Sequence, residues 1–182
     1  MRKPRLRPRI VVRRDSVNQS ERSGPIRAIV IHSTESHNYE GPRDLEAIGS
    51  WFDNPAAQAS SHVCTDADGT SARYVPDHRK AWHCASYNSA TLGVEQIGFS
   101  SQPSWKDREV RETARWVAQW SIQHHIPIRK GAVSGGRVTR SGVLRHSDLG
   151  SLGGNHNDPG PNYPFGAMLR WARLYKRLRL NK

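Results

Sequence analysis

Three residues that lie far apart in the chain have side chains able to bind a divalent metal ion. His32 and His146 each follow a short run rich in Val, Ile and Leu, and Asp158 lies in a segment rich in Gly, Asn and Pro. A strand that ends at a histidine presents the imidazole at the edge of a sheet, where open α/β sheets bind ligands. Two imidazoles and one carboxylate would make a three-ligand zinc site with an open fourth position, as in hydrolytic zinc enzymes. The alternative, two hydrogen-bonded histidines without a metal, stays open because such distant ligands form no local motif.

Glu95 is the second residue that could do chemistry. It interrupts residues 92–97, which otherwise have the composition of a central strand. A carboxylate in that position either has a partner or is placed for proton transfer. The alternative is an edge strand on which Glu95 faces solvent.

A loop between two strand candidates carries Trp82, His83 and Asn88. Binding residues tend to collect in such loops, so we expect these three side chains near a ligand. Ordinary loop packing is the alternative.

The elements that would position these residues alternate between strands and helices. The predicted strands are 26–31, 61–64, 72–75, 91–97 and 143–145, and a turn at 66–69 joins the second and third as a hairpin. The predicted helices are 44–52, 106–125 and 166–178, from their apolar spacing. The Gly/Ser-rich segment 131–142 is predicted to be a mobile loop. This order predicts an α/β fold, a single domain with a central mixed β-sheet flanked by helices.

The net charge of +12 in 182 residues comes from the two ends. Residues 1–14 hold seven Lys/Arg and residues 159–182 hold six, with no acid in either segment, whereas the rest has 15 basic and 16 acidic residues. We therefore expect a basic, extended N-terminal arm at 1–24 and a domain at 25–182, which holds the candidate catalytic residues and ends in a basic amphipathic helix. Such ends would attract nucleic acid, an anionic lipid surface or an anionic cell-wall polymer, or serve as solubilising tails.

Several protein classes are excluded by composition. No apolar run approaches the roughly 18 residues of a membrane-spanning helix, and the basic N-terminus lacks the apolar core of about 7–15 residues that a secretory signal needs. Two cysteines cannot support a disulfide scaffold. Whether Cys64 and Cys84 pair or remain two buried thiols is left open by their spacing.

Six segments, taken together and in order, resemble the zinc-dependent N-acetylmuramoyl-L-alanine amidases. This family includes phage lysozyme-like amidases, anhydromuramyl-peptide amidases and animal peptidoglycan recognition proteins. The resemblance extends over about residues 25–175. The segments that carry it are Ile29–Thr34, Ala59–Val63, Asp68–Thr70, Ala81–His83, Leu92–Glu95, and His146 through Asp158 to Pro161.

The resemblance implies a role for each candidate residue. One zinc ion would be held by His32, His146 and Asp158, as in the branch of the family whose third ligand is Asp. Glu95 falls on the proton-transfer position. His156 falls where the family often has Lys, so a histidine would stabilise the oxyanion here. The implied substrate-binding residues are Thr34, His62, Trp82, His83 and Asn88.

The implied activity is hydrolysis of the amide bond between N-acetylmuramic acid and L-alanine in peptidoglycan. A phage endolysin released through a holin and a cytoplasmic recycling enzyme both fit a chain without an export signal, and the basic ends favour the endolysin. The alternative is a non-hydrolytic peptidoglycan-binding module, but that usually lacks a metal ligand. A nuclease is disfavoured because the body has no cationic stripe, so no specific nucleic acid is expected.

Overall fold

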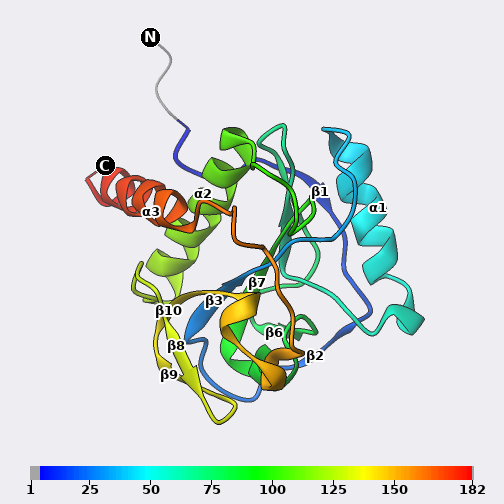
Figure 1. The fold of residues 1–182 in the computed structure, drawn as a ribbon, viewed down its shortest axis with the longest axis vertical. Helices are drawn as coiled ribbons and strands as arrows, with labels where there is room; N and C mark the ends of the chain where they lie inside the picture. The colour runs from blue at the N-terminus through cyan, green and yellow to red at the C-terminus, as the bar shows by residue number, and fades with distance from the viewer. Residues whose placement is uncertain (1–4, 182) are drawn as a thin grey trace.

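A six-stranded mixed sheet divides the helices into two layers in the computed structural model, which describes residues 5–181 (Figure 1). In spatial order its strands are β1 (Ile10–Arg13), β5 (Ser71–Arg73), β4 (Val63–Thr65), β7 (Thr91–Gln96), β3 (Ala28–Ile31) and β10 (Gly142–Arg145). Neighbouring strands are parallel except β4 and β5, which form the predicted antiparallel hairpin. The α/β prediction is therefore confirmed.

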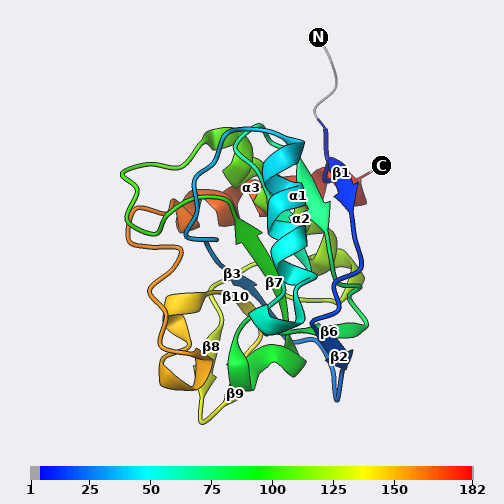
Figure 2. The same cartoon turned by 90° about the vertical axis from the view of Figure 1, so that its right-hand side faces the viewer.

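The three helices cover opposite faces of the sheet, as Figure 2 shows. α1 (Pro42–Phe52) lies on one face, and α2 (Asp107–Gln123) and α3 (Phe165–Leu180) pack together on the other. All three correspond to predicted helices. Trp116 and Trp120 of α2 are fully buried in one core layer with Ile29 and Ile31 of β3. The apolar spacing in the sequence thus marked the faces that pack on the sheet.

The N-terminal segment does not form the separate extended arm that we expected for residues 1–24. Among its described residues, β1 joins the sheet beside β5, and β2 (Gln19–Glu21) pairs with β6 (Arg79–Ala81). Leu6 and Val12 are buried, and Ser16 and Asn18 hydrogen-bond the end of α1. The few inward-facing residues are scattered among Arg and Pro, so the sequence shows no recognisable strand pattern here. Met1–Pro4, with Arg2 and Lys3, and Lys182 at the other end lie outside the described residues.

The predicted mobile loop at 131–142 is also wrong. It contains an antiparallel hairpin, β8 (Ala132–Ser134) and β9 (Arg137–Arg140). Gly135 and Gly136 both have positive φ, 53° and 73°, which is the conformation that a two-residue hairpin turn requires. The side chain of Val138 is buried beneath the hairpin. The two glycines therefore shape a turn.

Short 3₁₀ helices connect the remaining elements: η1 (Pro55–Ala57), η2 (Ala85–Ala90), η3 (His146–Asp148) and η4 (Ser151–Gly153). Cys64 and Cys84 are both free and buried, so they do not pair. Among the helices of the described chain, none is long and apolar enough to cross a membrane.

Candidate metal centre

Three neighbouring parallel strands end at one edge of the sheet and carry candidate residues there. The register places Ile31, the last residue of β3, opposite Val94 of β7 and Arg145 of β10. Side chains alternate between the two faces of a sheet, so the next residue of each strand should project to the same side. Those next residues are Glu95, His32 and His146.

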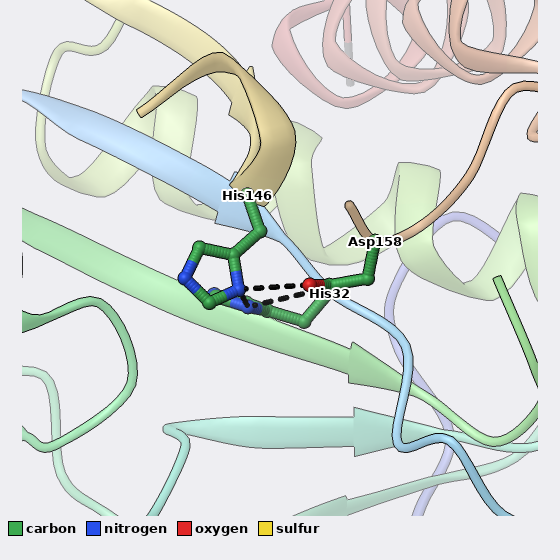
Figure 3. A group of neighbouring side chains, drawn as sticks. All are labelled: His32, His146 and Asp158. Atoms are coloured by element: carbon green, nitrogen blue, oxygen red, sulfur yellow. Dashed lines mark hydrogen bonds and ion pairs between the residues drawn. The ribbon is translucent and has the colours of Figure 1, made fainter. Parts of the chain in front are cut away.

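The ligand atoms of the two histidines and Asp158 meet at this edge (Figure 3). The Nδ1 atoms of His32 and His146 are 2.9 Å apart. The Asp158 carboxylate oxygens lie 3.3 Å from Nδ1 of His32 and 3.0 Å from Nδ1 of His146. Ligands about 2.0–2.1 Å from a tetrahedral zinc ion are roughly 3.3 Å from one another. The three side chains therefore fit a single ion of this size.

Surrounding polar groups orient two of these side chains. Nε2 of His146 is 2.8 Å from the backbone oxygen of Gly153, which can only accept a hydrogen bond. The proton of a neutral His146 must then lie on Nε2, and Nδ1 keeps a lone pair directed at the centre. The backbone N–H of Ser33 donates to Oδ2 of Asp158 at 3.2 Å. Such outer contacts are those that fix metal ligands in place.

The charge states also suit a cation. Burial, together with the neighbouring His146, lowers the pKa of His32 to about 4, so this ring is neutral at pH 7. Burial alone would raise the pKa of Asp158, but its contacts with His146 and His32 outweigh burial and hold it well below its usual range. The site therefore offers a neutral His32 imidazole and an ionised Asp158 carboxylate, which are the forms that bind metal.

The three candidate ligands border a cleft of about 470 Å³, which Glu95 also lines. Oε2 of Glu95 is buried and, among the described residues, has no hydrogen-bond partner. Burial first, and then the negative charges of Asp158 and Glu35, raise the pKa of Glu95 well above its usual value. A carboxyl that holds its proton more tightly than usual, beside a candidate metal site, is suited to proton transfer.

His156 and Thr34 lie on the same cleft. The ring of His156 stacks on that of His146, with centroids 4.3 Å apart, and its side chain is 58% exposed. The hydroxyl of Thr34 contacts Oγ of Ser36 at 2.7 Å and accepts a hydrogen bond from Gly98 N–H. Both predicted residues are thus placed where they can reach a bound molecule.

Trp82 and Asn88 also line the cleft. Nε1 of Trp82 donates a hydrogen bond to Oγ of Ser20 in β2, so the N-terminal segment supports one wall of the cleft. Oδ1 of Asn88 accepts hydrogen bonds from the backbone N–H groups of His83 and Cys84, at 2.9 and 2.6 Å. Asn88 therefore shapes the loop that follows Trp82.

The structure places the other two predicted substrate-binding residues differently. His62 is wrong as a substrate contact, because its side chain is fully buried and contacts Arg22 and the backbone N–H of Gly93. His83 lines the cleft, but both of its ring nitrogens have partners within the protein, His32 and Thr91. Neither imidazole has a polar atom free for substrate.

Sequence reasoning missed two features of the site. One is Glu35, which lines the cleft. Its carboxylate accepts hydrogen bonds from Ser33 Oγ and Ser100 N–H. The sequence gives no signal for it beyond its position after the first predicted strand. The other is the contact of His83 with His32. Its signal is Gly93, because a glycine inside a strand marks the close approach of another group.

Comparison with known proteins gives matches over most of the chain. A family model described as N-acetylmuramoyl-L-alanine amidase matches residues 22–161. The N-acetylmuramoyl-L-alanine amidase A of Achromobacter lyticus is 29% identical over 167 residues, which are 88% of this chain and 87% of that protein.

Two solved structures share the fold. One is the Staphylococcus aureus hydrolase AmiA in complex with its ligand, with a TM-score of 0.72, 19% identity, and coverage of 97% of this chain and 87% of that one. The other is the endolysin N-acetylmuramoyl-L-alanine amidase LysCS from Clostridium intestinale, with a TM-score of 0.63, 18% identity, and coverage of 96% and 97%.

The raised pKa of Glu95 predicts how its replacement affects stability. A carboxyl whose pKa is higher in the folded than in the unfolded state lowers the free energy of unfolding as pH rises from its unfolded pKa, about 4.3, to its folded pKa. Glu95→Gln should therefore make the metal-free protein more stable than the wild type at pH 7, with the difference shrinking toward pH 4. Thermal unfolding at several pH values measures it.

The solvent-exposed Glu40 provides the control, since Glu40→Gln removes a carboxyl away from the cleft. If Glu95→Gln and the wild type were equally stable at pH 7, or if their difference did not change with pH, the carboxyl of Glu95 would not have the raised pKa of a buried group.

Proposed function

The chain belongs to the N-acetylmuramoyl-L-alanine amidase family, and we propose that it hydrolyses peptidoglycan with the residues of the cleft. The bond cleaved is the amide between the lactyl group of N-acetylmuramic acid and L-alanine of the stem peptide. The observation that carries the residue assignment is the alignment of Glu95, His32 and His146 on three adjacent strands, with Asp158 in reach of both imidazoles.

In this proposal His32, His146 and Asp158 hold one zinc ion. Zinc held there would supply Lewis acidity, which would polarise the carbonyl of the scissile amide and lower the pKa of the attacking water. The two imidazoles and the carboxylate leave one side of the centre open toward the cleft that Glu95 lines. Hard-ion sites are instead built from oxygen ligands, so this nitrogen-rich set favours zinc over magnesium or calcium.

Glu95 is the proposed general base and acid. Its carboxylate accepts a proton from the attacking water as the water oxygen bonds to the lactyl carbonyl carbon. When the carbon–nitrogen bond breaks, Glu95 returns this proton to the alanine nitrogen. The products are a glycan with a free lactyl carboxylate and a peptide with a new amino terminus.

His156 is the proposed stabiliser of the oxyanion. Its exposed ring, stacked on His146, can donate a hydrogen bond to the oxygen on which charge develops. The Thr34 hydroxyl, which lines the same cleft, can add a second hydrogen bond. Trp82 provides an apolar wall for the muropeptide, and Asn88 holds the loop behind it.

Release of peptide from purified peptidoglycan tests the hydrolysis. The wild type should produce peptides with free amino-terminal alanine, and a strong chelator should abolish this activity until zinc is restored. Asp158→Ala and Glu95→Gln should each lower the rate by at least about 100-fold, since they remove a ligand and the proton carrier.

The same experiment decides between an enzyme and a binding module. Asp158→Ala should still sediment with peptidoglycan, because binding does not need the complete metal site. If the wild type sediments with peptidoglycan but releases no amino-terminal alanine, the non-hydrolytic alternative is correct. Activity that a chelator leaves untouched would contradict the zinc mechanism.

We further propose that the basic termini bind phosphate-bearing polymers of the cell envelope, as expected of an endolysin-type enzyme acting on the wall after holin-type release. The first described residues of the chain and the end of α3 lie at the same end of the molecule (Figures 1 and 2). Burial and the positive charge of Arg7 lower the pKa of Arg179, which places these two cations near each other. Deleting residues 1–14 would remove β1, so charge replacement is the better test.

Replacing Arg170, Arg173 and Arg177, all exposed on α3, by Gln should weaken binding to anionic envelope polymers at low salt. Cosedimentation with walls carrying phosphate polymers, and with vesicles containing lipopolysaccharide, measures this and separates the two sources. The control replaces the exposed Arg43, Arg137 and Arg140, with the same change in net charge. Equal losses in both triple variants, or a loss that salt does not diminish, would contradict a local basic site.

A further inference from the structure

The hydroxyl of Thr91, at the start of β7, has three polar neighbours behind the candidate metal centre. Its Oγ1 lies 2.8 Å from the backbone oxygen of Tyr87, 3.1 Å from Nε2 of His83 and 3.2 Å from Sγ of Cys84. A backbone oxygen can only accept, so the single hydroxyl hydrogen is donated to Tyr87. Oγ1 must then accept hydrogen bonds from His83 and Cys84.

Both neighbours are in the form that donates. Burial raises the pKa of Cys84 to about 12, so its thiol keeps its hydrogen. The ring of His83 lies against those of His32 and His62, with centroids 5.1 and 5.6 Å away, and none of the ion pairs among the described residues includes it, so we take this imidazole in its neutral form with one proton. Because Nε2 of His83 donates to Thr91, that proton lies on Nε2.

The other nitrogen of His83 therefore carries a lone pair, and it faces His32. Nδ1 of His83 is 2.9 Å from Nε2 of His32. For this contact to be a hydrogen bond, Nε2 of His32 must donate. A neutral His32 with its proton on Nε2 has a bare Nδ1, the atom that meets His146 and Asp158.

The backbone around His83 is shaped to hold the ring in this position. A Cβ built on Gly93 of β7 would lie 2.8 Å from Nδ1 and 2.9 Å from Cγ of His83, closer than real Cβ contacts. The glycine thus leaves the space that the ring occupies against the strand. In addition, Oδ1 of Asn88 accepts a hydrogen bond from the backbone N–H of His83, which fixes the start of the loop.

We propose that His83, oriented by Thr91, is a positioning residue that fixes the proton of His32 on Nε2 and so keeps Nδ1 available to a metal ion. The inference rests on the proposed function, because it concerns the same zinc site. The competing tautomer has its proton on Nδ1, 3.3 Å from a carboxylate oxygen of Asp158, where it would form a hydrogen bond and block the ligand position. The series of hydrogen bonds from Tyr87 through Thr91 and His83 favours the tautomer of His32 whose proton is on Nε2.

Replacement of Thr91 tests whether the hydrogen bonds run from His32 to His83 and from His83 to Thr91. Thr91→Val keeps the side-chain shape but cannot accept from His83, whereas Thr91→Ser keeps the hydroxyl. Thr70→Val is the matched control, since it removes another buried hydroxyl, one that donates to Asp68 in a turn. Zinc affinity, measured by competition with a chromophoric chelator, should fall about 10–100-fold in Thr91→Val and remain near wild type in the other two variants.

The tautomer of His32 is the second readout and needs no zinc and no substrate. Nitrogen-15 NMR of the metal-free wild type and Thr91→Ser should show the His32 proton on Nε2, and Thr91→Val should show it partly or wholly on Nδ1. A wild-type proton on Nδ1 overturns the proposal, even if Thr91→Val does not fold. So does unchanged zinc affinity in a folded Thr91→Val, or an equal loss in Thr91→Ser. A chain that shows the expected tautomers but no peptidoglycan hydrolysis would refute the proposed function alone.

Discussion

The structure depends on the meeting of three electron-pair donors at one edge of the sheet. Two imidazole nitrogens and a carboxylate approach to within 2.9–3.3 Å of one another. Without a cation or a proton between them, such lone pairs repel, and burial of the carboxylate is costly. The fold holds them together by parallel pairing of β3 with β10 and β7, and by backbone groups such as Ser33 N–H and Gly153 O. Packing of α1, α2 and α3 on both faces keeps those strands in register.

The same strand register connects the metal centre with the proton carrier. Glu95 follows Val94, which pairs with Ile31 next to His32, so the pairing of β7 with β3 fixes the backbone of Glu95 beside the centre. Among the described residues, Oε2 of its carboxyl has no hydrogen-bond partner, and the burial of this group lowers the stability of the folded protein, as active-site groups often do. The N-terminal strands take part as well, since β2 supports Trp82 through Ser20. The basic segment is thus part of the scaffold as well as a carrier of charge.

Much of this site could be predicted from the sequence, and the exceptions have physical reasons. His32 and His146 are predictable because each follows a short apolar strand, and Glu95 because it is a carboxylate inside an otherwise apolar strand. Asp158 lies in a loop without periodicity, so the sequence pattern offers it only as a candidate carboxylate, and the resemblance adds its place as the third ligand. The N-terminal strands were missed because Arg and Pro outnumber the inward-facing Leu6 and Val12. His83 was assigned to substrate because the direction of an imidazole in a loop depends on tertiary contacts.

The metal centre can be tested by anomalous scattering from a crystal of the zinc-loaded protein, recorded on both sides of the zinc absorption edge. We expect one strong peak within bonding distance of Nδ1 of His32, Nδ1 of His146 and the carboxylate of Asp158, with an open side toward Glu95. A peak at another set of residues, or coordination through Nε2 of His32, would contradict it.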